Sequence, residues 1–163
     1  MKIVHYPHPA LRHAAKPVLS IDKQLHLHIG SMMDLMYEAK GLGLAAPQVG
    51  SPLRVAVMDG TGHPKVAESH GLLILVNPKI EQSGGAVVQR EGCLSVPDLT
   101  ANVRRATRVH LTAFDQFGSA REWWLEGFEA IIAQHEVDHL DGKLFLDRIA
   151  NVATDVFRRK TYV

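Results

Sequence analysis

Apolar residues recur at helical spacing in a segment that begins after Asp22. The apolar positions are Leu25, Ile29, Met32, Met33 and Met36. Spacings of three and four residues place them on one face of a helix. The Asp22 side chain can accept hydrogen bonds from the unpaired N–H groups of a first turn, and Gly41 is suited to a helix end. The pattern predicts a first helix between Asp22 and Gly41.

A second helical pattern begins at Glu126 and runs to Gly142. Its apolar face carries Phe128, Ile131, Ile132, His135, His139 and Leu140. Glycine is the residue most often found just past the C-cap, because it adopts the left-handed conformation without strain. We therefore expect a second helix that presents two histidines on its apolar face.

Strands are predicted by two other kinds of pattern. Short apolar runs bounded by Gly, Pro and Asn, from Leu53 to Met58 and from Leu72 to Val76, are typical of buried strands. Residues 109–113 alternate apolar and polar side chains, and Asp115 to Gly118 has the composition of a turn. This turn predicts a hairpin whose second strand lies at residues 120–125.

The two ends of the chain differ from its centre. Pro7, Pro9 and Pro17 predict an extended arm at the N-terminus. Val152, Val156 and Phe157 predict a short, weakly amphipathic helix that ends in Arg158-Arg159-Lys160. The sequence shows no repeat or linker, so we expect one α+β domain over residues 1–163. Mixed or antiparallel strands should pack around the second helix.

Composition narrows the possible functions. The net charge is +1 and the basic residues are scattered, so the chain lacks the basic surface expected for direct nucleic-acid binding. The N-terminus lacks a long apolar segment, and no apolar run approaches the length of a membrane span. The single cysteine agrees with a reducing compartment. We therefore expect a cytoplasmic protein that binds neither nucleic acid nor membrane.

The second helix contains the sequence His135-Glu136-Val137-Asp138-His139. Histidines four residues apart lie above one another on a helix, so both imidazoles can bind one metal ion. Glu136 lies about 100° around the helix from His135, beside such an ion. It can therefore carry a proton without taking a coordination position.

A catalytic metal site needs a third protein ligand and an open position. Zinc proteases of the long signature place a third histidine where this chain has Phe145, and no glutamate follows Glu136. Asp141, Asp147 and Asp155 are formal candidates. Cys93 is the better one, because a thiolate is a strong ligand. A lone cysteine is more often a small buried apolar residue, but the missing third ligand favours coordination.

Three segments together resemble the peptide deformylase family: Gly41 to Gln48, Glu91 to Ser95 and Gln134 to His139. They occur in the family's order, and the resemblance covers nearly the whole chain. It implies an α+β hydrolase that removes the formyl group from the N-terminal formylmethionine of newly made proteins and releases formate.

The resemblance also implies residue roles. Cys93, His135 and His139 correspond to the metal ligands, and Glu136 corresponds to the general acid and base. Gln48 and the backbone N–H of Leu94 correspond to the donors that stabilise the developing oxyanion. The family uses one divalent metal ion, with Fe²⁺ native in many members. Zn²⁺, Ni²⁺ or Co²⁺ can take its place.

The substrate pocket is predicted from the same motifs. The candidate substrate-binding residues are Gly41, Leu42, Gly43, Glu91, Gly92, Phe128, Ile131 and Ile132. The apolar members on the second helix suit a wall for the methionine side chain, but they also suit an ordinary core. The glycines allow backbone to approach a substrate, but they also suit a tight helix–strand contact.

One position departs from the family pattern. Several deformylases have an arginine seven residues after the cysteine, where this chain has Thr100. Arg104 and Arg105 are candidates to replace it. The basic tail is short for the ribosome docking that the family suggests. Two rival functions stay open at this point, a metalloprotease that cuts internal peptide bonds and a protein with a purely structural metal.

Overall fold

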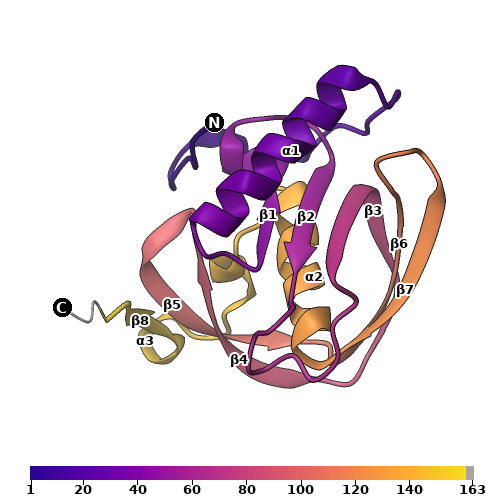
Figure 1. The fold of residues 1–163 in the computed structure, drawn as a ribbon. Coiled ribbons are helices and arrows are strands. Elements are labelled where there is room, and N and C mark those ends of the chain that lie inside the picture. Colours follow the sequence, from indigo (N-terminus) through magenta and orange to yellow (C-terminus); the bar gives the residue numbers. More distant parts are fainter. Residues whose placement is uncertain (161–163) are drawn as a thin grey trace.

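The computed structural model describes residues 1–160 and has two antiparallel sheets and a central helix, α2 (Figure 1). The helices are α1 (Lys23–Glu38), α2 (Gly127–Leu140) and α3 (Val152–Asp155), with 3₁₀ turns η1 (Pro9–Arg12), η2 (Ala46–Val49) and η3 (Phe145–Arg148). The strands are β1 (Gly43–Ala45), β2 (Val55–Asp59), β3 (Leu72–Gly84), β4 (Val87–Cys93), β5 (Val96–Arg105), β6 (Arg108–Phe114), β7 (Ala120–Glu126) and β8 (Val156–Arg158). The α+β class expected from the sequence is confirmed.

The larger sheet has the strand order β1-β2-β3-β6-β7, and a helix covers each of its faces at the β1–β2 end (Figure 1). The alternation along β2 shows this arrangement. Val55 and Val57 pack in the cluster of α1, whereas Ala56 and Met58 pack in the cluster of α2. Side chains of a strand point alternately to opposite faces. Both faces of β2 are therefore buried, as its unbroken apolar run predicted.

The smaller sheet has the strand order β4-β5-β8. Its apolar side chains form a third cluster with the N-terminal arm and η3, which contains Leu11, Cys93, Val96, Ala101, Val103, Leu144 and Phe145. The arm is pinned to the site region by backbone hydrogen bonds from Val4 N to Gln48 O and from Tyr6 N to Ser95 O. The extended N-terminal segment thus covers the core, interrupted by the turn η1.

The two predicted helices are present. The Asp22 side chain accepts a hydrogen bond from Leu25 N at 2.8 Å, and Gly142 lies past α2 with a φ of 73°. The sequence predicted Gly41 as the residue that ends α1, which is one residue too late. Lys40, with a φ of 54°, takes the left-handed position there, and Gly41 N then bonds to Met36 O.

The hairpin prediction is confirmed, since β6 and β7 pair from Arg108↔Glu126 to Phe114↔Ala120. The predicted helix of the tail is wrong beyond Asp155. Val156 to Arg158 form β8, which pairs with β5 at Ala101, Thr100 and Leu99. A free edge of β5 satisfies the backbone of these β-branched and aromatic residues, and a pattern within the tail does not reveal that edge. No helix among residues 1–160 is long and apolar enough to cross a membrane.

Candidate metal centre

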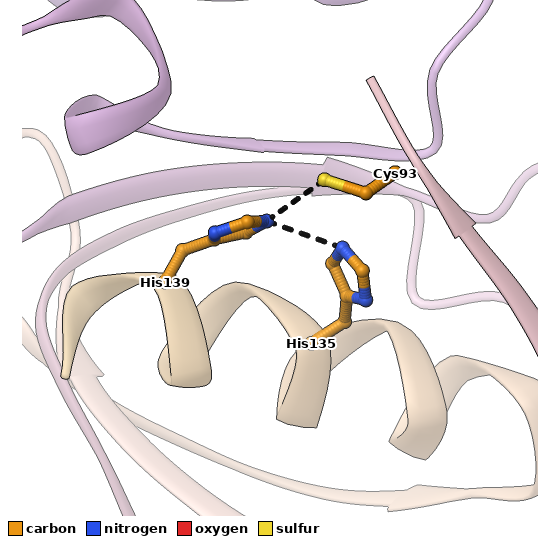
Figure 2. A group of neighbouring side chains, drawn as sticks. All are labelled: Cys93, His135 and His139. Atoms are coloured by element: carbon orange, nitrogen blue, oxygen red, sulfur yellow. Dashed lines mark hydrogen bonds between the residues drawn. The ribbon is translucent and has the colours of Figure 1, made fainter. Parts of the chain in front are cut away.

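Cys93, His135 and His139 point their donor atoms at one another (Figure 2). The Cys93 Sγ atom lies 3.2 Å from His139 Nε2, and the two Nε2 atoms of His139 and His135 are also 3.2 Å apart. One ligand atom from each residue lies within 4.8 Å of the other two. These three residues are the ones that the sequence predicted to meet.

The end of β4 positions Cys93. The strand pairs with β5 until a register shift between Gly92 and Cys93, after which Cys93 faces Val96 across a tight turn. Within that turn Ser95 N lies 3.4 Å from the Cys93 sulfur. The departure from regular strand pairing is therefore confined to a register shift and a turn where β4 and β5 meet. This turn aims the thiol at α2 and leaves it buried.

The donor set fits a divalent metal ion. One thiolate and two imidazoles are the ligands that Zn²⁺ and similar ions accept, and three ligands leave a position open. Burial and the neighbouring His135 lower the pKa of His139 well below its usual value, so the neutral, ligating imidazole is favoured. His135 Nδ1 lies 2.9 Å from the Glu91 carboxylate. Such a carboxylate fixes the orientation of a metal-binding imidazole.

Glu136 is buried beside this cluster. Its Oε2 atom has no hydrogen-bond partner among residues 1–160, and burial raises the pKa of its carboxyl to about 7. Gly43 of β1 packs so closely against the Glu136 carboxylate that a Cβ at position 43 would overlap it. The glycine in the first motif therefore has a physical reason: it leaves space for the Glu136 side chain.

Gln48 reaches the cluster from η2. Its Nε2 atom lies 3.5 Å from the Cys93 sulfur and 3.3 Å from Ser95 Oγ. Its Oε1 atom accepts a hydrogen bond from Ala45 N at 2.9 Å. This bond fixes which end of the amide faces Cys93. Gln48 is thereby held as a hydrogen-bond donor toward the site.

A network of buried charged side chains contacts the candidate ligand His135. The sequence did not predict this network. Arg105 donates to Glu91 at 2.6 and 3.0 Å and to Asp138 at 2.6 Å, and Arg148 also pairs with Asp138. Burial alone would raise the pKa of Glu91, but hydrogen bonds from Arg105 and His135 outweigh it and lower the pKa to about 2. Glu91 is therefore a charged partner for His135, which adds a supporting role to the substrate contact predicted for it.

A cavity of about 350 Å³ opens beside the cluster. All of the predicted substrate-binding residues line it: Gly41, Leu42, Gly43, Glu91, Gly92, Phe128, Ile131 and Ile132. Gln48, Leu94, Cys93, His135 and Glu136 line it as well. The cavity therefore joins the three sequence motifs, with apolar side chains of α2 along one wall.

The two arginines predicted to replace the family's arginine, Arg104 and Arg105, do not line this cavity. Arg105 is buried in the charge network, and Arg104 lines a different cavity. Arg90 and Arg159 line the site instead, together with Lys40. Arg159 could not be found from the sequence, because only the pairing of β8 with β5 brings the C-terminal tail to this place.

Comparisons with known proteins agree with this geometry. The family model of polypeptide deformylase matches residues 1–155. A peptide deformylase of Rhodopirellula baltica is 45% identical over 149 residues, which cover 91% of this chain and 73% of that protein. One from Aquifex aeolicus is 44% identical over 147 residues, covering 90% and 86%.

Solved structures give the same result. The peptide deformylase of Legionella pneumophila has a TM-score of 0.85 and 43% identity, over 93% of this chain and 86% of that one. The enzyme of Thermotoga maritima has a TM-score of 0.84 and 38% identity, over 92% and 97%. This chain therefore belongs to the polypeptide deformylase family, whose metal-dependent enzymes remove the N-formyl group from newly made peptides.

Proposed function

We propose that this peptide deformylase uses Cys93, His135 and His139 to hold one divalent metal ion and Glu136 to move protons. The observation that carries the proposal is the convergence of the three donor atoms beside a buried carboxylate, at a cavity with apolar side chains of α2 in its lining. We further propose that residues 1–163 act as one catalytic domain on formylmethionyl nascent chains.

A bound divalent ion supplies Lewis acidity and lowers the pKa of water toward neutrality. Glu136 then accepts a proton from the attacking water and delivers it to the amine that leaves. A pKa of about 7 suits both transfers, since the same group must take up and release a proton near neutral pH. Its burial also keeps bulk water from competing for that proton.

The carbonyl oxygen of the formyl group gains negative charge as its carbon becomes tetrahedral. Gln48 Nε2 and the backbone N–H of Leu94 are proposed to donate hydrogen bonds to it. The contact of Gln48 with Ala45 N supports this role, because it fixes the amide before substrate arrives. No reorganisation of the donor is then needed during the reaction.

The methionine side chain is proposed to enter the apolar part of the cavity. Phe128, Ile131 and Ile132 of α2 line that part, and Leu42, on the segment before β1, lines the same cavity. Burying a methionine side chain is worth about 1.5–3 kcal/mol. This contribution favours formylmethionine over smaller formylated residues.

We propose Fe²⁺ as the native ion, with Zn²⁺, Ni²⁺ or Co²⁺ able to replace it. One thiolate and two imidazoles accept all four ions, so the donor set alone does not distinguish them. A cytoplasmic location and ribosome docking stay predictions.

The test compares formyl-Met and acetyl-Met peptides with wild type, Glu136→Ala and Glu136→Gln, each loaded anaerobically with Fe²⁺ or with Zn²⁺. The assay measures released formate and bound metal. We expect wild type to release formate only from the formyl peptides, faster with iron. Both variants should keep the metal and lose at least about 10²- to 10⁴-fold in rate.

Three results would contradict the proposal in different ways. Cleavage of internal bonds without formate would identify a protease. Tightly bound metal with no hydrolysis of any substrate would indicate a structural site. Formate release by metal-loaded Glu136→Ala within a few-fold of wild type would remove Glu136 from proton transfer.

A further inference from the structure

The solvent-facing charge at the mouth of the active-site cavity is positive. Lys40, Arg90 and Arg159 line the cavity and are exposed. The two acidic side chains of the lining, Glu91 and Glu136, are buried. Glu91 is moreover paired with Arg105. Among the side chains that line the cavity, the exposed charges are therefore all positive.

The C-terminal strand carries Arg159 to this place. Thr100 of β5 pairs with Phe157 of β8, and Arg159 N donates to Asp98 O at 2.8 Å. The backbone is thus fixed up to this residue. The guanidinium lies against Gly92, where a Cβ would overlap it and also contact Thr100. Gly92 directly precedes the metal-ligand candidate Cys93, and Arg159 and Cys93 line the same cavity.

The guanidinium groups of Arg159 and Arg90 differ in the contacts that they make. The Arg90 guanidinium stacks 3.5 Å from the centre of the Phe157 ring and donates to Asn102 at 3.0 Å. It therefore fastens β8 to β4 across β5. The Arg159 guanidinium has no hydrogen-bonding partner within residues 1–160 and lies at the cavity. No residue of this described part of the chain competes with a ligand for its donors.

We propose that Arg159 is a specificity-determining residue that binds a side-chain carboxylate in the residues directly after the formylmethionine. This inference rests on the proposed function. A guanidinium and a carboxylate form paired, charge-assisted hydrogen bonds. Lys40 and Arg90 add a positive field that attracts acidic peptides and repels basic ones. The preferred substrates are formylmethionyl chains that begin with acidic residues.

The test uses amidated formyl-Met peptides that differ only in carrying Glu, Gln or Lys at the two positions after methionine. Amidation removes the terminal carboxylate, which would otherwise bind the same guanidinium. The proteins are metal-loaded wild type, Arg159→Ala, Arg159→Glu and the matched control Arg158→Ala. Arg158 is the last residue of β8, and it is exposed and does not line the cavity. Thermal unfolding checks that all four proteins are folded.

Wild type should prefer the Glu peptide over the Lys peptide by about tenfold in kcat/KM at low salt, with most of the difference in KM. Arg159→Ala should lose most of this preference, and Arg159→Glu should invert it. Arg158→Ala should keep the ratio of wild type. Added salt should reduce the wild-type ratio, because exposed charges are screened.

Other outcomes would overturn the inference. Equal rates for the three peptides would show that the mouth does not select charge, while formate release would leave the proposed function intact. A preference that persists in Arg159→Glu would assign selectivity to Lys40 and Arg90. An equal loss in Arg158→Ala would indicate a general charge effect. Absence of formate from every peptide with wild type would instead overturn the proposed function.

Discussion

The two sides of α2 are held by different forces. On the side of the larger sheet, the helix packs directly on the strands through apolar side chains such as Ile132, Ala133 and Val137. On the side of the smaller sheet, Arg105 and Glu91 reach the helix through buried ionic hydrogen bonds. Apolar packing is non-directional, whereas a charged hydrogen bond fixes an orientation. The apolar side therefore places the helix, and the polar side orients the candidate ligands that it carries.

The polar side of α2 depends on buried charges, whose loss of a partner strongly lowers the stability of the fold. Burying a charge costs several kcal/mol of lost hydration. Attraction to an oppositely charged partner offsets this cost only when the hydrogen-bond geometry is good. Here each carboxylate has at least two partners: Glu91 has Arg105 and His135, and Asp138 has Arg105 and Arg148. The side with the network is therefore the more sensitive one to loss of a single partner.

Arg105→Met should have the largest effect on stability. It leaves Glu91 with no cation except His135, and an uncompensated buried charge typically costs about 3–5 kcal/mol. Urea unfolding should show this loss of unfolding free energy. Arg104→Met is the control, because Arg104 is the exposed neighbour on β5 and should change stability by only about 0.5 kcal/mol. Equal effects of the two variants would contradict the importance of the network.

Leu111→Ala tests the apolar side. Leu111 of β6 is fully buried in the cluster that contains Ile132 and Val137, and truncation should cost about 2–5 kcal/mol. The folded variant should still bind one metal ion, because the ligands keep their polar supports. The control is Val88→Ala on β4, which is 63% exposed. Loss of metal from the folded Leu111 variant would show that packing also aims the ligands.

Glu91→Gln should have a smaller effect, concentrated on the metal. The amide oxygen can still accept a hydrogen bond from His135, but the charge is lost. Metal affinity should fall by about 10- to 100-fold, as measured by competition with a chelator. Glu122→Gln is a matched control, since Glu122 contacts His110 at 2.8 Å on the distant hairpin. Unchanged affinity in Glu91→Gln would refute the supporting role of this carboxylate.

Local patterns in the sequence were sufficient for α1, α2 and the candidate ligands, but not for the tail after Asp155. The 3.6-residue period located α2, and the spacing of His135 and His139 within it placed both imidazoles on one face. Cys93 followed from the absence of another third ligand. The three side chains lie together as predicted, because each inference depends on residues close in the chain or on the chemistry of one residue type.

The sequence by itself thus determined which residues carry the proposed chemistry, whereas only the tertiary structure decided what supports and surrounds them. Glu91, Arg105 and Asp138 come from two strands and a helix, so no local spacing marks their ion pairs. The strand β8 exists because β5 has a free edge, and Arg159 reaches the cavity only through that pairing. Long-range backbone pairing and buried charge are properties of packed elements, and neither leaves a periodic signal in the chain.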